Sequence, residues 1–250
     1  MHGKNAATMT KSTSPCLLLI LPILMLFSGC VTEVHEAESE ASAELGSPAS
    51  AEETTTVDLM EGKEWKYEDS GEDLGSAWRE IDFDDAGWDS GPAPLGYGDD
   101  DIATELEFGL NDKEKHITSY FRTEFEIAVN KDVTEMRASL RCDDAAIIYL
   151  NGQEVIRNNL PEDEVGYKTH AVEIISGEQE KEYHDYAMDS GAVKTGRNVL
   201  AVEMHQRGPT SSDLIFDLRA EVDLKTKSTP PRPQHGGRKA GPKVFKRSRL

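Results

Sequence analysis

An Asn-Gly pair between two apolar runs is the feature that most constrains the fold of this chain. Asn151-Gly152 follows the run Ala-Ala-Ile-Ile-Tyr-Leu at 145–150 and precedes Gln-Glu-Val-Ile-Arg at 153–157. Both residues of such a pair readily adopt the positive φ that a two-residue turn between antiparallel strands requires. The sequence therefore predicts a β-hairpin here, within a chain built from β-strands.

Hydrophobic residues in the rest of the central region alternate with a period of two, which is typical of half-buried strands. The inward positions form four sets: Leu214, Phe216, Leu218, Ala220, Val222 and Leu224; Ile117, Phe121, Phe125 and Ile127; Met136, Ala138, Leu140 and Cys142; and Leu200, Val202 and Met204. Residues 145–150 are apolar on both faces and suit a central strand. Short strands with turns between them predict an all-β antiparallel sandwich over residues 57–224, with Cys142 in its core.

The N-terminal residues 1–29 are predicted to be an export signal. Lys4 and Lys11 precede the apolar run 17–27, which is shorter than the roughly 20 residues that a membrane-spanning helix needs. Leu-Phe-Ser-Gly-Cys at 26–30 resembles the processing site of bacterial lipoproteins, in which the cysteine is lipidated. We therefore expect Cys30 to anchor an exported protein to the membrane of the cell envelope. An ordinary secretory cleavage that leaves Cys30 as a free thiol is the alternative.

The segments on either side of the sandwich have biased compositions. Residues 30–56 are rich in Glu, Ala and Ser without an aromatic residue, so we expect a lipidated cysteine followed by a disordered acidic tether. Residues 225–250 hold nine of the 27 Lys and Arg residues and no acidic residue, which leaves 18 basic against 47 acidic residues, or −29, for the remainder. This disordered basic tail could bind nucleic acid, an anionic envelope polymer or the protein's own acidic face, or it could be solvated.

Several fragments, in their order along the chain, carry a resemblance to a known family. They are Trp65-Lys-Tyr67, Phe83 to Trp88, Ala93 to Gly98, Tyr120-Phe-Arg122, Asp143 to Pro161, Asn198 to Gln206 and Ser211 to Asp217. Together they resemble the galactose-binding-like jelly-roll modules of secreted bacterial hydrolases and phosphoesterases. The resemblance implies a sandwich of eight or nine strands, loops at one end that contact sugars, and in many members a structural calcium ion.

Polar and aromatic residues in or near the predicted strand ends are candidates for sugar contact. Carboxylates and amides can pair with sugar hydroxyls, and an aromatic ring can cover the apolar face of a pyranose. The candidates are Asp143, Asp144, Asn151, His205, Gln206 and Asp213, with Tyr149 or Tyr97 as the ring. Two structural explanations stay open, because the turn alone accounts for Asn151 and Asp144 could brace a neighbouring loop. Trp65, Trp78 and Trp88 lie beside apolar residues and are predicted to pack in the core.

The densest run of carboxylates is Asp99-Asp100-Asp101, between Gly98 and Ile102. Calcium prefers six to eight oxygen ligands, and a bent acidic loop can provide them. We therefore consider a structural calcium ion at this run, with solvated surface charge as the alternative. Zinc is not indicated, because the histidines are scattered and no His/Cys cluster has ligand spacing.

Three functions from different classes follow from these features. The first is a non-catalytic, carbohydrate-binding lipoprotein that binds a glycan or envelope polysaccharide. The second is a lipoprotein that binds a protein partner, as an accessory to a separate hydrolase or phosphoesterase. The third is a small hydrolase that uses His205 or Asp213, although no nucleophile elbow or phosphate-binding glycine loop supports it. No feature indicates sequence-specific binding of nucleic acid.

Overall fold

The computed structural model describes residues 53–228, which form two packed β-sheets and contain no α-helix. The first sheet contains β1 (Thr54–Asp58), β4 (Leu95–Tyr97), β5 (Thr104–Glu105), β7 (Lys131–Asp143), β10 (His184–Met188) and β12 (Leu214–Thr226). The second contains β2 (Trp65–Glu68), β3 (Asp89–Gly91), β6 (Thr118–Ile127), β8 (Ala145–Leu150), β9 (Gln153–Asn158) and β11 (Gly196–His205). Three short 3-10 helices lie in the connections: η1 (Ala77–Arg79), η2 (Gly177–Lys181) and η3 (Ser190–Ala192).

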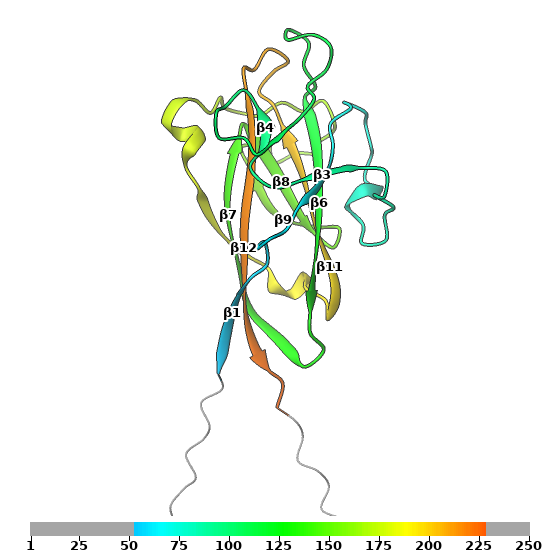
Figure 1. Cartoon of the computed structure of the whole chain (residues 1–250), viewed down its shortest axis with the longest axis vertical. Helices are drawn as coiled ribbons and strands as arrows, with labels where there is room; N and C mark the ends of the chain where they lie inside the picture. Colours follow the sequence, from blue (N-terminus) through cyan, green and yellow to red (C-terminus); the bar gives the residue numbers. More distant parts are fainter. Residues whose placement is uncertain (1–52, 229–250) are drawn as a thin grey trace, which may run out of the picture. The chain divides into compact units, whose positions relative to one another are not determined.

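The strand order is β10-β7-β12-β4-β5 in the first sheet, with β1 also paired to β12, and β3-β2-β6-β11-β8-β9 in the second. Neighbouring strands are antiparallel except for β4 and β5. From β5 onward nearly every connection passes from one sheet to the other, which is the arrangement of a jelly roll (Figure 1). The predicted all-β antiparallel sandwich is confirmed.

The Asn-Gly hairpin forms as the sequence predicts. Leu150 at the end of β8 pairs with Gln153 at the start of β9. Asn151 and Gly152 between them have φ values of 53° and 87°, as a type I′ turn requires.

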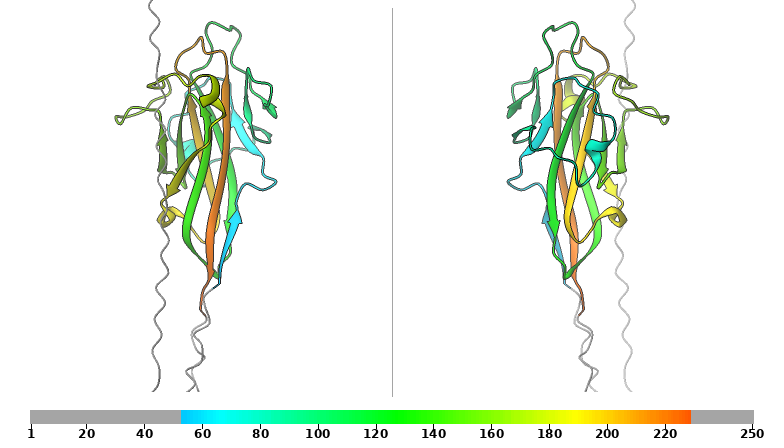
Figure 2. Two further views of the ribbon diagram at one scale, coloured as in Figure 1. Left: turned by 90° about the vertical axis from the view of Figure 1, so that its left-hand side faces the viewer. Right: turned by 90° about the vertical axis from the view of Figure 1, so that its right-hand side faces the viewer.

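The main core lies between the two sheets and is built from the alternate residues of the long strands. Figure 2 shows β7 and β12 side by side along their length. The inward residues predicted for β7, β11 and β12 are all buried, including the thiol of Cys142. Phe216 lies in the main core between two other aromatic residues. The centroid of its ring is 4.6 Å from that of Phe121 and 4.9 Å from that of Trp65. Ile117 differs from the prediction, because it precedes β6 and is only half-buried.

A second, smaller core covers the outer face of the second sheet. It forms because β8 is apolar on both faces: Ala146, Ile148 and Leu150 face the first sheet, and the alternate residues face outward. Trp78 of η1 and Leu160 of the connection after β9 close over that outer face and are buried. The connections that contain Trp78 and Leu160 therefore form a third layer, which packs on the outer face of the second sheet. This layer also positions several polar side chains near the strand ends.

A buried ion pair fixes the segment that carries Trp78. Arg122 of β6 is almost completely buried on the outer face of the second sheet, and its Nε donates to Asp85 Oδ2 over 2.7 Å. Its Nη1 donates to the carbonyls of Trp78 and Glu80. Burial alone would raise the pKa of Asp85, but hydrogen bonds from Arg122 and Lys66 lower it. Asp85 is therefore an ionised partner that holds the loop against the sheet.

The folded region extends slightly beyond the boundaries expected from composition. The β-branched residues of β1 pair with β12 from Thr54 opposite Lys225 to Asp58 opposite Glu221, so residues 54–56 and 225–226 belong to strands. The signal 1–29, the lipidation site Cys30, the tether up to residue 52 and the tail from residue 229 lie outside the described residues. Residues 53–228 contain no helix that could span a membrane.

The tryptophans provide a test of the core. Trp65 is 1% exposed against Phe216. Trp88 packs against the second core beside Phe83, as predicted, but it is only half-buried. Trp65→Ala should lower the free energy of unfolding by about 3–5 kcal/mol because it leaves a cavity. Trp88→Ala should cost clearly less. Urea unfolding of both variants measures the difference, and equal losses would contradict the assignment of the two environments.

Candidate functional site

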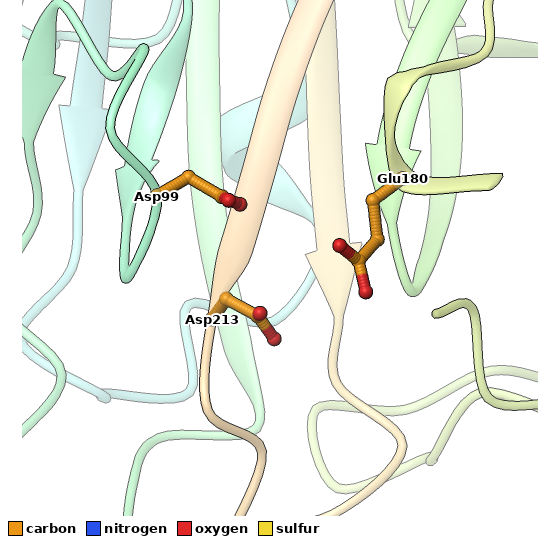
Figure 3. A group of neighbouring side chains, drawn as sticks. All are labelled: Asp99, Glu180 and Asp213. Atoms are coloured by element: carbon orange, nitrogen blue, oxygen red, sulfur yellow. The ribbon is translucent and has the colours of Figure 1, made fainter. Parts of the chain in front are cut away.

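Three carboxylates converge at one end of the sandwich, where β12 begins and β4 ends. The side-chain oxygens of Asp99, Glu180 and Asp213 lie within 4.8 Å of one another, and Figure 3 shows the three side chains pointing toward a common region. Asp99 follows β4, Asp213 precedes β12, and Glu180 lies on η2. Gly98 allows this approach, because a Cβ there would lie 2.8 Å from the Cα of Asp213. We call Asp99, Glu180, Asp213 and the adjacent Asp143 the acidic centre.

Asp143 is the most unusual member of the acidic centre. It ends β7 opposite Ile215 of β12 and is 1% exposed, yet neither carboxylate oxygen has a hydrogen-bond partner among the described residues. Burial, followed by the negative charges of Asp144 and Asp213, raises the pKa of Asp143 to about 9. A buried, unpartnered carboxylate is costly to keep ionised unless a proton or a cation compensates it.

Two further buried oxygens at this end also lack partners within residues 53–228. They are Oδ2 of Asp99 and Oε1 of Gln206. Burial, and then the charges of Asp213 and Asp101, raise the pKa of Asp99. The amide nitrogen of Gln206 donates to the hydroxyl of Tyr97 and to the carbonyl of Asp213, so its oxygen remains available beside the acidic centre.

The predicted run Asp99-Asp100-Asp101 does not act as one unit. Asp101 accepts hydrogen bonds from both terminal nitrogens of Arg141, at 2.5 and 3.3 Å, and Asp100 is exposed. Arg141 also donates to the carbonyl of Glu180 over 2.6 Å. Only Asp99 of the run faces the other carboxylates, because three successive residues cannot point the same way. The acidic cluster could bind a metal ion, but its members come from distant parts of the chain.

Asp144 and His205, two of the candidates for sugar contact, are buried and have internal partners. Asp144 is 1% exposed and accepts hydrogen bonds from the backbone N–H groups of Ile175 and Arg207, at 2.9 and 2.6 Å. These bonds give Asp144 the loop-bracing role that was the structural alternative. His205 is fully buried, with Nδ1 near Thr118 Oγ1 and the carbonyl of Thr169. Neither side chain can contact a sugar in solvent in this structure.

Asn151 lies at the other end of β8, away from the acidic centre, so it cannot share a site with Asp143. Its amide nitrogen donates to Asn198 Oδ1 and to the carbonyl of Ala192, and its oxygen accepts from the N–H of Val199. Both polar atoms are therefore used within the fold, in agreement with the structural explanation.

A cavity of about 430 Å³ opens on the outer face of the second sheet. Tyr120, Tyr149 and Tyr167 contribute aromatic rings, and Arg79 and Glu203 contribute charges. We call this cavity the tyrosine pocket. It lies where the connecting segments around η1 and around residues 164–167 leave part of the second sheet uncovered.

The floor of the tyrosine pocket is a hydrogen-bonded group of charged and polar side chains. Glu203 Oε1 accepts from the hydroxyl of Tyr149 over 2.6 Å and from Arg79 over 3.3 Å, and Oε2 lies 3.5 Å from Nε2 of His205. Burial alone would raise the pKa of Glu203, but these neighbours lower it. The pocket thus has an ionised carboxylate at its base, held in place by three side chains.

Of the two tyrosines predicted to cover a sugar ring, Tyr149 lines the tyrosine pocket and Tyr97 does not. Tyr149 lines the tyrosine pocket, but it is 4% exposed and Arg79 covers one face of its ring at 4.2 Å. Tyr97 is buried beside Gln206 and does not line the pocket. The accessible ring is that of Tyr167, which is half-buried and whose hydroxyl donates to the carbonyl of Gly71.

Another groove, of about 510 Å³, crosses the outer face of the first sheet between β7, β10 and β12. Its arginines are Arg137, which pairs with Asp223, and Arg219, which stacks over Tyr183 at 4.0 Å. Among the described residues that line it, the single aromatic side chain is Tyr186, whose hydroxyl bonds to Asn158. The tyrosine pocket offers more aromatic surface and more converging polar groups, so we regard it as the better ligand site.

Glu203 is a pocket residue that the sequence predictions missed, although β11 carries a signal for it. In this strand Leu200, Val202 and Met204 face the main core, so Glu203 must face the outer side. A charged residue inside such an apolar strand indicates a partner on that face. Arg79 and Tyr167 carry no comparable signal, because they reach the pocket from long connections.

Comparison with family models gives no match, and neither does comparison with curated proteins. Among solved structures, Bacteroides uniformis beta-glucuronidase 2 is 18% identical with a TM-score of 0.43, over 68% of this chain and 18% of that chain. A glycosyl hydrolase family 2 member from Bacteroides cellulosilyticus is 16% identical with a TM-score of 0.43, over 67% of this chain and 20% of that chain. The chain thus spans about a fifth of the length of these proteins, and such distant similarity assigns no activity.

The pKa of Asp143 predicts a specific dependence of stability on pH. Because this pKa is raised on folding, the folded protein binds the proton more tightly than the unfolded chain does. The contribution of Asp143 therefore lowers the free energy of unfolding as the pH rises from about 4 toward about 9. Asp143→Asn removes this titration and should be more stable than the parent at pH 8, with a smaller difference at pH 4. Urea unfolding in a chelating buffer tests this, and parallel pH profiles of the two proteins would contradict it.

Proposed function

We propose that this protein is a non-catalytic carbohydrate-binding module of the galactose-binding-like type. The observation that carries the proposal is the tyrosine pocket, in which rings and charged groups are fixed in place before any ligand arrives. Tyr167 supplies an accessible ring, and Arg79 and Glu203 hold each other at the base. Rigid polar groups beside aromatic surface suit a sugar, whose hydroxyls need directed partners and whose ring carbons need an apolar contact.

The pocket supports binding better than catalysis. The buried carboxylate Glu203 is hydrogen-bonded to Tyr149 and ion-paired with Arg79, so its oxygens are committed to the protein. Glycoside hydrolysis uses two carboxyl groups that face each other across the bond to be broken. Of the other carboxyl groups at the pocket, Glu154 is bound at both oxygens by Arg157, and Asp73 and Glu164 are exposed.

We further propose that the module is exported, lipidated at Cys30 and displayed at the bacterial cell envelope. This part rests on the residues around Cys30 and on the composition of residues 30–56. The ligand would then be a glycan or an envelope polysaccharide within reach of the tether. Mass spectrometry of the mature N-terminus tests the lipid, and an unmodified Cys30 would refute this part alone.

The acidic centre fits a calcium ion. Two oxygens on opposite sides of calcium are separated by up to about 5 Å, because each lies about 2.3–2.6 Å from the ion. The oxygens of Asp99, Glu180 and Asp213 meet this limit, and Asp143 and Gln206 add buried oxygens without partners. Calcium here would have a structural role, because it would link the segment after β4, η2 and the segment before β12.

Glycan binding provides the main test. On a glycan array, the parent should bind a defined group of glycans and Tyr167→Ala should weaken binding about tenfold, since an aromatic anchor commonly contributes more than 1 kcal/mol. Tyr167→Phe keeps the ring and should retain most of the affinity. Tyr183→Ala is the matched control, because Tyr183 bonds to Asp217 of the first sheet, far from the pocket in the fold. An array without signal from well-folded protein would overturn the proposal.

Calcium binding is tested by thermal unfolding. Calcium at 100 times its Kd should stabilise the parent by about 2.7 kcal/mol and raise the Tm accordingly. Asp213→Asn should abolish the shift because it removes a central ligand. Asp100→Asn, which removes the same charge from an exposed neighbouring position, should keep it. A Tm of the parent that does not respond to calcium would contradict the calcium site and leave the glycan proposal intact.

A further inference from the structure

The charges around the tyrosine pocket are unequal, and this inequality indicates which sugars it selects. Six charged side chains line it: Asp73, Arg79, Glu154, Arg157, Glu164 and Glu203. Four are acidic and two are basic, so the lining has a net charge of −2. Outside the basic tail the whole chain is also strongly acidic. An anionic ligand would therefore approach against the field of the protein, and a cationic ligand would approach with it.

Each arginine of the pocket already has an acidic partner inside it. Arg157 donates to both oxygens of Glu154, at 2.8 and 2.7 Å, and to the carbonyl of Pro161 over 2.6 Å. Arg79 pairs with Glu203 and lies over the ring of Tyr149. A carboxylate or sulfate on the ligand would therefore have to share an arginine whose charge is already neutralised by Glu203 or Glu154.

Two of the acidic side chains are available to a ligand. Asp73 and Glu164 are exposed, and neither forms an ion pair with a residue in the described range. They come from the connection before η1 and the connection after β9, next to the accessible ring of Tyr167. A ligand that combines a ring-shaped apolar face with an ammonium group would satisfy the carboxylates and the ring together.

We propose that the tyrosine pocket selects amino sugars whose amine is free and protonated, such as glucosamine units, over neutral N-acetylated sugars and over uronic acids. This inference rests on the proposed function, since it names the class of sugar that the same pocket binds. Tyr167 covers the sugar ring, and Asp73 and Glu164 bind the ammonium group.

Isothermal titration of the full chain with three oligomers of equal length tests this inference: glucosamine, N-acetylglucosamine and galacturonate. The glucosamine oligomer should bind at least tenfold more tightly than the acetylated one, and the uronate should bind most weakly. Asp73→Asn and Glu164→Gln should each weaken glucosamine binding by about three- to tenfold and weaken binding of the acetylated oligomer by a clearly smaller factor. Glu105→Gln, an exposed carboxylate on β5 of the first sheet, should change neither.

Trilysine controls for general attraction of a cation to an acidic protein. It should bind more weakly than the glucosamine oligomer and should not respond to Tyr167→Ala. Equal binding of the glucosamine and acetylated oligomers, a preference for the uronate, or trilysine binding equal to that of glucosamine would overturn the inference of amino-sugar selectivity. If the acetylated oligomer binds and the glucosamine oligomer has no advantage, the proposed glycan function stands. If no oligomer binds, the inference of amino-sugar selectivity fails, and the glycan array decides whether the proposed glycan function stands.

Discussion

The buried pair of Arg122 and Asp85 is the interaction on which the tyrosine pocket depends. The second sheet is apolar on its outer face as well as its inner face, so it requires a cover. Arg122 reaches out of that sheet to the carbonyls of Trp78 and Glu80 and to the carboxylate of Asp85. One guanidinium thereby fixes the connection that contains η1. The tyrosine pocket is the part of the outer face that this cover and the segment around Tyr167 leave open.

The tyrosine pocket and the acidic centre each contain a buried carboxylate, but the two carboxylates are compensated differently. In the tyrosine pocket, Glu203 is surrounded by donors, and its carboxylate is ionised at low cost. In the acidic centre, Asp143 is surrounded by other carboxylates and has no donor within the described residues. The charge of Glu203 is thus compensated without a ligand. The charge of Asp143 requires a proton or a cation to compensate it, so the acidic cluster could bind a metal ion.

The sequence was a good guide to whatever depends on local pattern. The alternation in β12 and the turn at Asn151-Gly152 arise from neighbouring residues, and both appear as predicted. The candidate site was predicted less well, because burial depends on segments distant in the sequence. Asp144 and His205 lie near strand ends, which suggested exposure, but the connection 159–175 folds over them. Similarly, Asp99 could be recognised as acidic, whereas Glu180 and Asp213 join it only through the strand order.

The pairing of β1 with the end of β12 has a consequence for how the domain can be combined with others. Thr54 and Lys225 are direct partners, so the folded unit begins and ends at almost the same place, as Figure 1 shows. The acidic centre lies at the opposite end of β12, about 40 Å away for a strand of 13 residues. A unit with adjacent ends can be inserted into a surface loop of a host protein without distorting either partner. A host protein that carried residues 54–226 in this way would hold the acidic centre far from the point of insertion.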